Sequence, residues 1–508
     1  MQQCFMFLDW GDGWTAVNDH VNDVAALDGF SIQWGSDAID TQPDPSVMSF
    51  TLRDRTGWLT GRALTLAGAR VLVQISEQPT WGMLRTDMGA WSAQRMRLDA
   101  MHQAYTPGVP SSASSTATTL FDGLIQNGGE VRPHGAGWLL ELSASSRMTL
   151  WKRLQKQGPT SSDARFTGLH WVGSADARLA ELNRRAVSAH APRANTSGLD
   201  TSASPAPYKT DDYPSQLDLL HRTFAHSGMF PLWYEYPDRD SSRLDYMPFG
   251  APVTIGIDAH GRLTVTDWMH ETLDGLDASC IITDDDQALT IPEPVTQFVV
   301  QGKAAKASDG VLDFDQHDTE ITAGGMLPDN LTATQSSITV ESDAVAADES
   351  DGVWGRAGGT VWQPGADEKA AFARLLVTMD RRLRPETIVF DSLKLDPATH
   401  SRFYITASSG PFIIQGATAS RLAGDDGTPA AGGAWASIGG TLTYQWEQGR
   451  PRLRNEVTIW PLPTGTTHMV KWGDMGAWPV TWATAALTLA ELSLIDTYQQ
   501  PTTQEETE

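Results

Sequence analysis

The residues whose types and spacing come nearest to a catalytic metal motif are His270 and Glu271. A zinc protease helix begins in this way and places a second histidine one helical turn later, so that both imidazoles reach the metal. Position 274 is Asp274 rather than histidine. Without the second imidazole the motif is incomplete, and we predict no zinc chemistry here.

Two acid-rich stretches have the composition of cation sites. Asp284–Asp286 and Asp313–Asp318 each place several carboxylates close together. Calcium takes several oxygen ligands from one loop, and neither stretch continues as the loop with a closing glutamate that an EF-hand needs. We therefore interpret both stretches as solvated turns.

Paired glycines offer a third kind of site. The pairs at Gly11 and Gly13 and at Gly439 and Gly440 lack the lysine and the following helix of a phosphate-binding loop, so both are predicted to be turns. The chain also has no Gly-x-Ser-x-Gly nucleophile elbow. We predict no catalytic, cofactor-binding or metal-binding residue, no cofactor, and a protein that is not an enzyme.

Charge and composition narrow the classes of partner. The net charge is −25 over 508 residues, whereas binding to nucleic acid or to anionic lipid needs basic patches. The two cysteines, Cys4 and Cys280, are too few for a disulfide framework and are expected to be separate free thiols. The N-terminus has no signal-peptide pattern, and no apolar stretch reaches the roughly eighteen residues of a spanning helix. We expect synthesis in a reducing cytoplasm and no membrane insertion.

The elements that organise the chain lie between Leu27 and Gly57. Apolar residues alternate with polar ones at Phe30, Ile32 and Trp34, and again at Met48, Phe50 and Leu52, which is the period of half-buried strands. The polar arm between them, 35–46, contains two prolines, which favour an extended crossing over a helix or a central strand. A turn at 54–57 and a strand over 68–75 follow.

Later segments alternate between strand and helix patterns. Helices are predicted over 143–155, 174–187, 215–225 and 366–384 from apolar stripes at helical spacing, with Pro214 before the third helix and Pro385 after the fourth. Strand patterns are predicted over 120–125, 138–142, 230–236, 253–257, 263–265, 295–301, 440–446 and 455–460. The order is therefore β, then α/β, then β with an inserted helix.

This pattern resembles a known family. Trp34–Gly35, then Gln42 to Ser46 with its two prolines, then Ser49–Leu52 before an aspartate resemble the opening of the tail hub proteins of long-tailed bacteriophages. These are baseplate-hub-like proteins of the tail tip, and are often called minor tail proteins. The resemblance is greatest to those of actinobacterial phages and extends in patches over residues 20–465.

The resemblance implies a multidomain, β-dominated α+β fold with two β-barrel-like hub domains, a smaller α/β domain and an inserted helix. The implied divisions are a first β hub domain at 1–142, an α/β domain with a returning β-hairpin at 143–275, and a second β hub domain at 276–465. The inserted helical segment spans about 345–385. The last part, 466–508, is a Trp-rich segment with a disordered tail.

The same resemblance implies a non-enzymatic structural protein of the virion. It would form a homotrimer at the tail tip and close the tail tube. Its partners would be the distal tail protein, the tape-measure protein, and tip or fibre proteins. DNA would contact the protein only in transit through the channel during genome ejection. The acidic wall of that channel would disfavour DNA binding. The protein would be made in the bacterial host's cytoplasm.

Two alternatives stay open at this point. Within the same assembly, the chain is also compatible with a distal tail or other baseplate ring protein. From a different class, its tryptophans suggest a carbohydrate-binding or cell-wall-hydrolysing β protein, because indole rings stack on sugars. The tryptophans that raise this alternative are Trp435, Trp446, Trp460, Trp472, Trp478 and Trp482.

Overall fold

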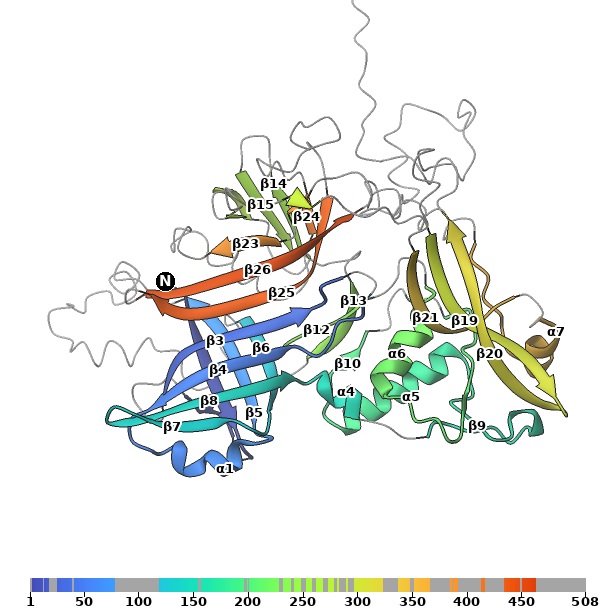
Figure 1. Cartoon of the computed structure of the whole chain (residues 1–508), viewed down its shortest axis with the longest axis horizontal. Coiled ribbons are helices and arrows are strands. Elements are labelled where there is room, and N and C mark those ends of the chain that lie inside the picture. The colour runs from blue at the N-terminus through green and yellow to red at the C-terminus, as the bar shows by residue number, and fades with distance from the viewer. Residues whose placement is uncertain are drawn as a thin grey trace, which may run out of the picture.

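The fold is dominated by β-strands with a few short helices (Figure 1). It was obtained as a computed structural model that describes most of residues 2–77, 118–365 and 434–462, together with 384–391 and 413–415. Short gaps interrupt these ranges, the longest of them at 323–336. Of the predicted elements, the helix at 366–384 lies outside the described residues except for its last position.

The first β unit contains the organising stretch. Its central strands are β3 (Ala26–Gly35) and β4 (Val47–Asp54), which pair antiparallel with Phe30 opposite Phe50 and Ile32 opposite Met48. The strand, arm and strand predicted from the sequence are therefore confirmed. The other strands and short helices of this unit are β1 (Gln2–Asp9), β2 (Thr15–Ala16), η1 (Thr60–Arg62), α1 (Ala63–Leu66), β5 (Arg70–Glu77), β6 (Thr118–Ile125), β7 (Glu130–His134) and β8 (Gly137–Ser146).

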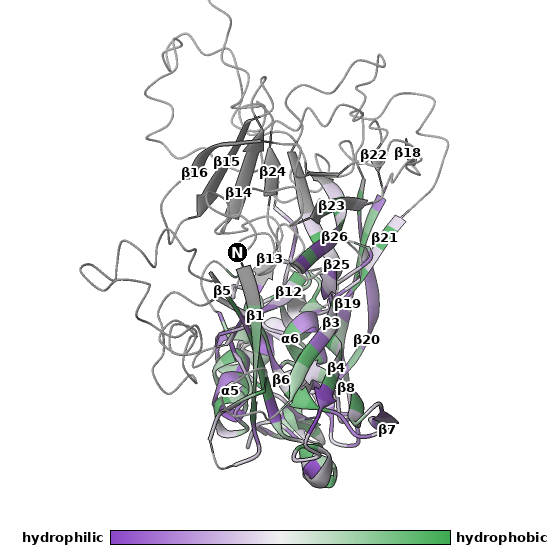
Figure 2. Ribbon diagram, turned by 90° about the vertical axis from the view of Figure 1, so that its left-hand side faces the viewer, coloured by the Kyte–Doolittle hydropathy of each residue, from purple (hydrophilic) through white to green (hydrophobic). Residues whose placement is uncertain are grey.

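Alternation along these strands produces the core. Figure 2 shows hydrophobic and hydrophilic residues following one another along the strands, and on β4 every second side chain from Met48 onward is buried. Because successive strand side chains point to opposite faces, one face packs on the core while the other meets solvent. The buried residues Cys4, Phe50 and Leu140 belong to one continuous cluster of this kind.

Strands from the end of the chain extend the same sheet. β25 (Ala434–Glu447) pairs antiparallel with β3 on the side opposite to β4, and β26 (Arg450–Leu462) pairs with β25. Together with the strands of the first unit they belong to a sheet of 16 strands, counted over the described residues, and the two separate barrel-like units stay a prediction. The other strands of this sheet are β14 (Val253–Ile257), β15 (Arg262–Asp267), β16 (Leu273–Asp277), β17 (Ile281–Ile282), β23 (Thr387–Asp391) and β24 (Ile413–Gln415). Two short strands, β18 (Leu289–Thr290) and β22 (Arg384–Pro385), pair with each other in a separate sheet.

The middle domain packs helices against short strands. Two of its helices, α5 (Ala175–Ser188) and α6 (Gln216–Phe224), begin where the sequence predicts, because Ser174 and Ser215 accept hydrogen bonds from the first helical turns. The helix expected from residue 143 is shorter than predicted, since β8 continues to Ser146. The domain's other elements are α4 (Thr149–Arg153), η3 (Ala164–Phe166), β9 (Leu169–His170), β10 (Arg193–Ala194), β11 (Tyr208–Lys209), β12 (Leu232–Tyr236) and β13 (Arg243–Met247).

A three-stranded sheet lies at the far side of the middle domain from the first β unit (Figure 1). β19 (Gln297–Ser308) pairs antiparallel with β20 (Val311–Thr322) and parallel with β21 (Ser337–Val345). A short helix α7 (Asp351–Trp354) and the turn η6 (Gly355–Ala357) follow.

Candidate functional site

The arm between β3 and β4 fastens the middle domain to the large sheet. Pro43 and Pro45 are both buried, although the arm as a whole is polar. The side-chain oxygen of Gln42 accepts a hydrogen bond from the backbone N–H of Trp233 on β12 at 3.3 Å, and Asp44 forms an ion pair with Lys152 on α4. Because prolines hold few backbone conformations, the arm loses little entropy in making these contacts.

A single carbonyl joins three parts of the fold. The oxygen of Ile438 on β25 accepts a hydrogen bond from the backbone N–H of Ser36 at 2.9 Å and another from the hydroxyl of Tyr234 at 2.7 Å. The ring of Tyr234 also meets Trp34 edge-on, with centroids 6.5 Å apart. The end of β3, the C-terminal strand β25 and the middle-domain strand β12 therefore converge on one atom.

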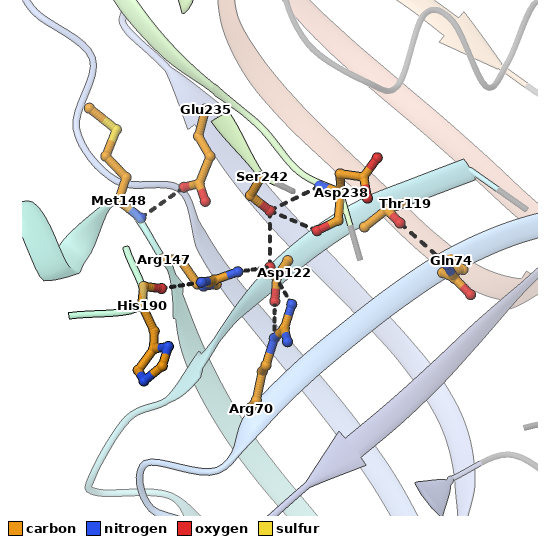
Figure 3. Close-up of polar contacts among 10 residues, drawn as sticks. All are labelled: Arg70, Gln74, Thr119, Asp122, Arg147, Met148, His190, Glu235, Asp238 and Ser242. Carbon is orange, nitrogen blue, oxygen red and sulfur yellow. Dashed lines mark hydrogen bonds and ion pairs between the residues drawn. The ribbon is translucent and has the colours of Figure 1, made fainter. Parts of the chain in front are cut away.

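Beside this point lies a buried charge cluster, which we call the junction: Arg70, Asp122, Arg147, Glu235 and Ser242 (Figure 3). The fully buried carboxylate of Asp122 accepts bonds from Arg70 Nε and Nη2 at 2.7 and 2.9 Å. It also accepts from Arg147 Nη1 at 3.1 Å and from the hydroxyl of Ser242 at 3.0 Å. A buried carboxylate needs such partners, since an unpaired charge is costly away from water.

The junction spans two units of the fold. Asp122 and Arg70 come from strands β6 and β5 of the first unit, whereas Ser242 immediately precedes β13 of the middle domain. Arg147 follows β8 and donates a second hydrogen bond to the carbonyl of His190, just after the end of α5. The cluster therefore holds the large sheet and the middle domain in one relative orientation.

Glu235 is the second acid of the junction and has a different environment. One of its oxygens accepts a hydrogen bond from the backbone N–H of Met148 at 3.0 Å, while the other has no hydrogen-bond partner among the described residues. Burial raises the pKa of Glu235 to about 7, while the side chain of Ser146 and the N–H of Met148 oppose this shift. Glu235 lines a cavity of about 40 Å³ together with Trp34, Pro43 and Asp122.

The junction has the properties of a structural contact between domains and not those of a reaction site. The carboxylate of Asp122 is already neutralised by two guanidinium groups, and the cavity is far smaller than the roughly 300 Å³ of a typical ligand pocket. It is large enough to hold a water molecule beside the unsatisfied oxygen of Glu235. Among the described residues, no group of three or more His, Cys, Asp or Glu side chains is placed to hold a metal ion.

The raised pKa of Glu235 makes stability depend on pH. Between pH 4.5, its ordinary pKa, and about 7, the folded protein keeps the proton and the unfolded chain releases it, so folding weakens as pH rises through this window. The loss from this group is on the order of 3 kcal/mol. Glu235→Gln should remove it, as measured by urea unfolding at several pH values. The exposed Glu130→Gln variant should keep the wild-type profile, and parallel wild-type and Glu235→Gln profiles would refute the prediction.

A second buried ion pair joins the middle domain to the three-stranded sheet. Arg178 on α5 donates to Asp343 on β21 at 2.5 Å, and both side chains are at most 2% exposed. The hydroxyl of Tyr208 donates to both oxygens of Asp343 at 2.9 and 3.0 Å. Arg178 also donates to the carbonyls of Trp171 and Ala206 at 3.2 and 2.7 Å.

The structure shows where the second acidic stretch and the two glycine pairs lie. Asp313 and Asp315 lie on strand β20 rather than in a turn, and they form ion pairs with Lys306. The turn predicted at Gly439 and Gly440 is wrong, because both residues lie within β25. Gly11 and Gly13 do form a turn, in which Asp9 accepts both backbone N–H groups.

Other sequence predictions fall on residues that the structure does not describe. They are His270, Glu271, Asp284–Asp286, Cys280, Trp472, Trp478 and Trp482. Three of the residues singled out in the sequence are described: Cys4 is buried, Trp446 is exposed, and Trp460 is half-buried. No helix in the described part of the chain has the length and apolar character to cross a membrane.

The junction residues were missed by reasoning from the sequence. The signal was a single acid inside an apolar strand, in Leu120–Ile125 for Asp122 and in Leu232–Tyr236 for Glu235. An acid that replaces an apolar residue in such a run interrupts the core, so it indicates a buried partner from elsewhere in the chain.

Comparison with known proteins gives similarity at the level of structure alone. No family model matches the chain, and no curated protein matches it. A tail protein from Neisseria meningitidis MC58 is 9% identical with a TM-score of 0.41, over 90% of this chain and 96% of that one.

Two further solved structures are similar to a comparable degree. The 43 kDa tail protein of prophage MuSo2 from Shewanella oneidensis is 8% identical with a TM-score of 0.40, over 90% of this chain and 98% of that one. A prophage tail protein from Listeria monocytogenes EGD-e is 8% identical with a TM-score of 0.38, over 89% and 94%. Because these identities and TM-scores are low, the function of this chain has to rest on its own residues.

Proposed function

We propose that this chain is a structural protein of a phage tail, and within the tail the central hub of the tail tip. It is non-enzymatic, forms a homotrimer, closes the tail tube, and contacts the distal tail, tape-measure and tip or fibre proteins. The likeness to actinobacterial hubs stays a prediction.

One observation carries this proposal. The residues that give the sequence its resemblance to tail hubs are also the residues that form β3, β4 and the arm between them, which fastens the middle domain to the large sheet. Trp34 and Gly35 end β3 where it meets β25, Pro43 and Pro45 are buried in the arm, and Ser49–Leu52 continue as β4. The short segment that carries the resemblance therefore forms one structural feature, the end of β3, the arm and β4.

A rigid connection between domains favours assembly of a subunit with copies of itself. Closed rings form only when each subunit presents its contact surfaces at a fixed angle to one another. The junction and the Arg178–Asp343 ion pair fix the middle domain against its neighbours on both sides. A hub that opens for DNA would then move as rigid units.

Location in the particle tests the proposal. Electron microscopy of virions labelled with a gold-conjugated antibody against this chain should place the gold at the tail tip. Label along the tail tube or on the capsid would contradict the hub role. Native mass spectrometry of the purified tip complex should give three copies of the chain, whereas six copies would favour a distal tail or other baseplate ring protein.

A further inference from the structure

The loop between β4 and β5 is held rigidly at the end of the first β unit (Figure 1). Leu59 and Leu66 within it are buried in the core of that unit. The carboxylate of Asp54 accepts hydrogen bonds from the backbone N–H groups of Gly57 and Thr60, each at 2.8 Å. The loop therefore presents its remaining side chains to solvent in a fixed arrangement.

Large apolar side chains of this loop and of the adjacent start of β8 are exposed to solvent. Leu64 on α1 is 99% exposed, Trp58 is 36% exposed, and Trp138 at the start of β8 is 39% exposed. The guanidinium of Arg62 lies 3.9 Å from the ring centre of Trp58. We call Arg55, Trp58, Arg62, Leu64 and Trp138 the tip patch. Exposed aromatic, aliphatic and arginine side chains gathered in this way are typical of protein interfaces.

The tip patch has the opposite charge to the protein that carries it. Residues 53–70 contain four arginines and a single acid, Asp54, whereas the whole chain has a net charge of −25. Asp54 is buried, so it contributes little to the surface. Arg53 pairs with Asp28 and Arg70 with Asp122, so within the described part of the chain exposed Arg55 and Arg62 set the charge of the patch.

We propose that the tip patch binds an acidic surface of a second copy of this chain. A strongly acidic neighbour complements Arg55 and Arg62, while Trp58, Leu64 and Trp138 become buried at the centre of the contact. Two tip patches repel each other, so the patch meets a different surface of its neighbour. Contacts of this head-to-tail kind close into a ring when the rotation from one copy to the next is a whole fraction of a turn, which the proposed homotrimer requires. The inference rests on the proposed self-assembly and names the surface responsible for it.

Charge reversal tests the electrostatic part of the contact. The full-length Arg55→Glu, Arg62→Glu variant should need a roughly tenfold higher concentration to assemble than wild type, in light scattering and native mass spectrometry. The matched control is Arg153→Glu with Arg356→Glu, two exposed arginines elsewhere, which changes the net charge equally and should assemble as wild type. Equal weakening in both variants would overturn the proposal, because net charge alone would explain it.

A neutral substitution tests the apolar part. Leu64→Gln should also weaken assembly, whereas Val187→Gln, at an exposed position on α5, should not. Since these positions are exposed, circular dichroism should show an unchanged fold for both variants. Assembly that persists in the tip-patch variants would overturn this inference and leave the hub proposal intact, because virion labelling does not depend on it.

Other occupants of the patch give distinct results. Wild-type protein that stays monomeric at all concentrations would overturn the proposal. Sedimentation of that monomer with phosphatidylserine vesicles, lost in the Arg55→Glu, Arg62→Glu variant, would assign the patch to a lipid surface instead.

Discussion

Asp343→Ala should lower the free energy of unfolding by about 3 to 5 kcal/mol, because it leaves the guanidinium of Arg178 buried without its carboxylate. Both side chains are removed from water, so no solvent replaces the lost partner. The hydroxyl of Tyr208 loses its acceptor as well. Burial, and next the charge of Asp343, raise the pKa of Tyr208, so the phenol keeps its proton and remains a donor.

A double-mutant cycle separates the pair from its surroundings. Arg178→Met should cost about as much as Asp343→Ala, since it leaves the carboxylate unpaired. The combination Arg178→Met, Asp343→Leu should cost clearly less than the sum of the single changes, because neither charge is then buried alone. Urea unfolding followed by fluorescence and circular dichroism measures each value.

An exposed ion pair provides the control for this cycle. Asp28 and Arg53 pair at 3.0 Å with side chains 40% and 52% exposed, so Asp28→Ala should cost less than about 1 kcal/mol. A loss of that small size for Asp343→Ala would show that the buried pair does not hold the three-stranded sheet to the middle domain.

Gly439→Ala should have the second large effect, a loss of about 2 to 3 kcal/mol. A methyl group at this position would lie 2.3 Å from the carbonyl oxygen and 2.6 Å from the amide nitrogen of Ser36. Both atoms belong to the backbone, so no side-chain rotation relieves the contact. The strands β3 and β25 must separate, which breaks the hydrogen bonds that Ser36 and Tyr234 make to Ile438.

Hydrogen exchange shows which strands Gly439→Ala destabilises. Protection should fall first in peptides that cover β25, the end of β3 and β12. Gly355→Ala is the matched control, because a methyl group there meets no atom within 4 Å, and it should leave stability and exchange unchanged. Equal behaviour of the two variants would mean that β3 and β25 tolerate a wider separation than their geometry indicates.

The elements that the sequence predicted well depend on short-range rules. Ser174 and Ser215 begin α5 and α6 because a side-chain oxygen accepts a hydrogen bond from the first turn of its own helix. The alternation at Phe30 and Ile32 places a strand because the period of two is a property of neighbouring residues. Such signals are complete within a few positions of the chain.

The predictions that failed depend on partners far along the chain. Gly439 resembles a turn glycine when read with its neighbours, yet it is required within a strand by the backbone of Ser36, some four hundred residues earlier. Asp313 resembles a solvated turn acid, yet it lies on a strand and pairs with Lys209 of the middle domain, which is distant in the sequence. No local pattern encodes either neighbour.

The sequence by itself determined the class of fold, the proline arm, the capped helices and a strongly acidic chain. Only the tertiary structure decided that β25 lies beside β3, that Asp122 and Glu235 share a buried junction, and that arginines and exposed apolar side chains gather at one tip. The physical reason is that burial and pairing are properties of a position in space. A carboxylate has the same formula in a loop and in a core, and only its surroundings decide whether it is hydrated, paired with arginine or held protonated.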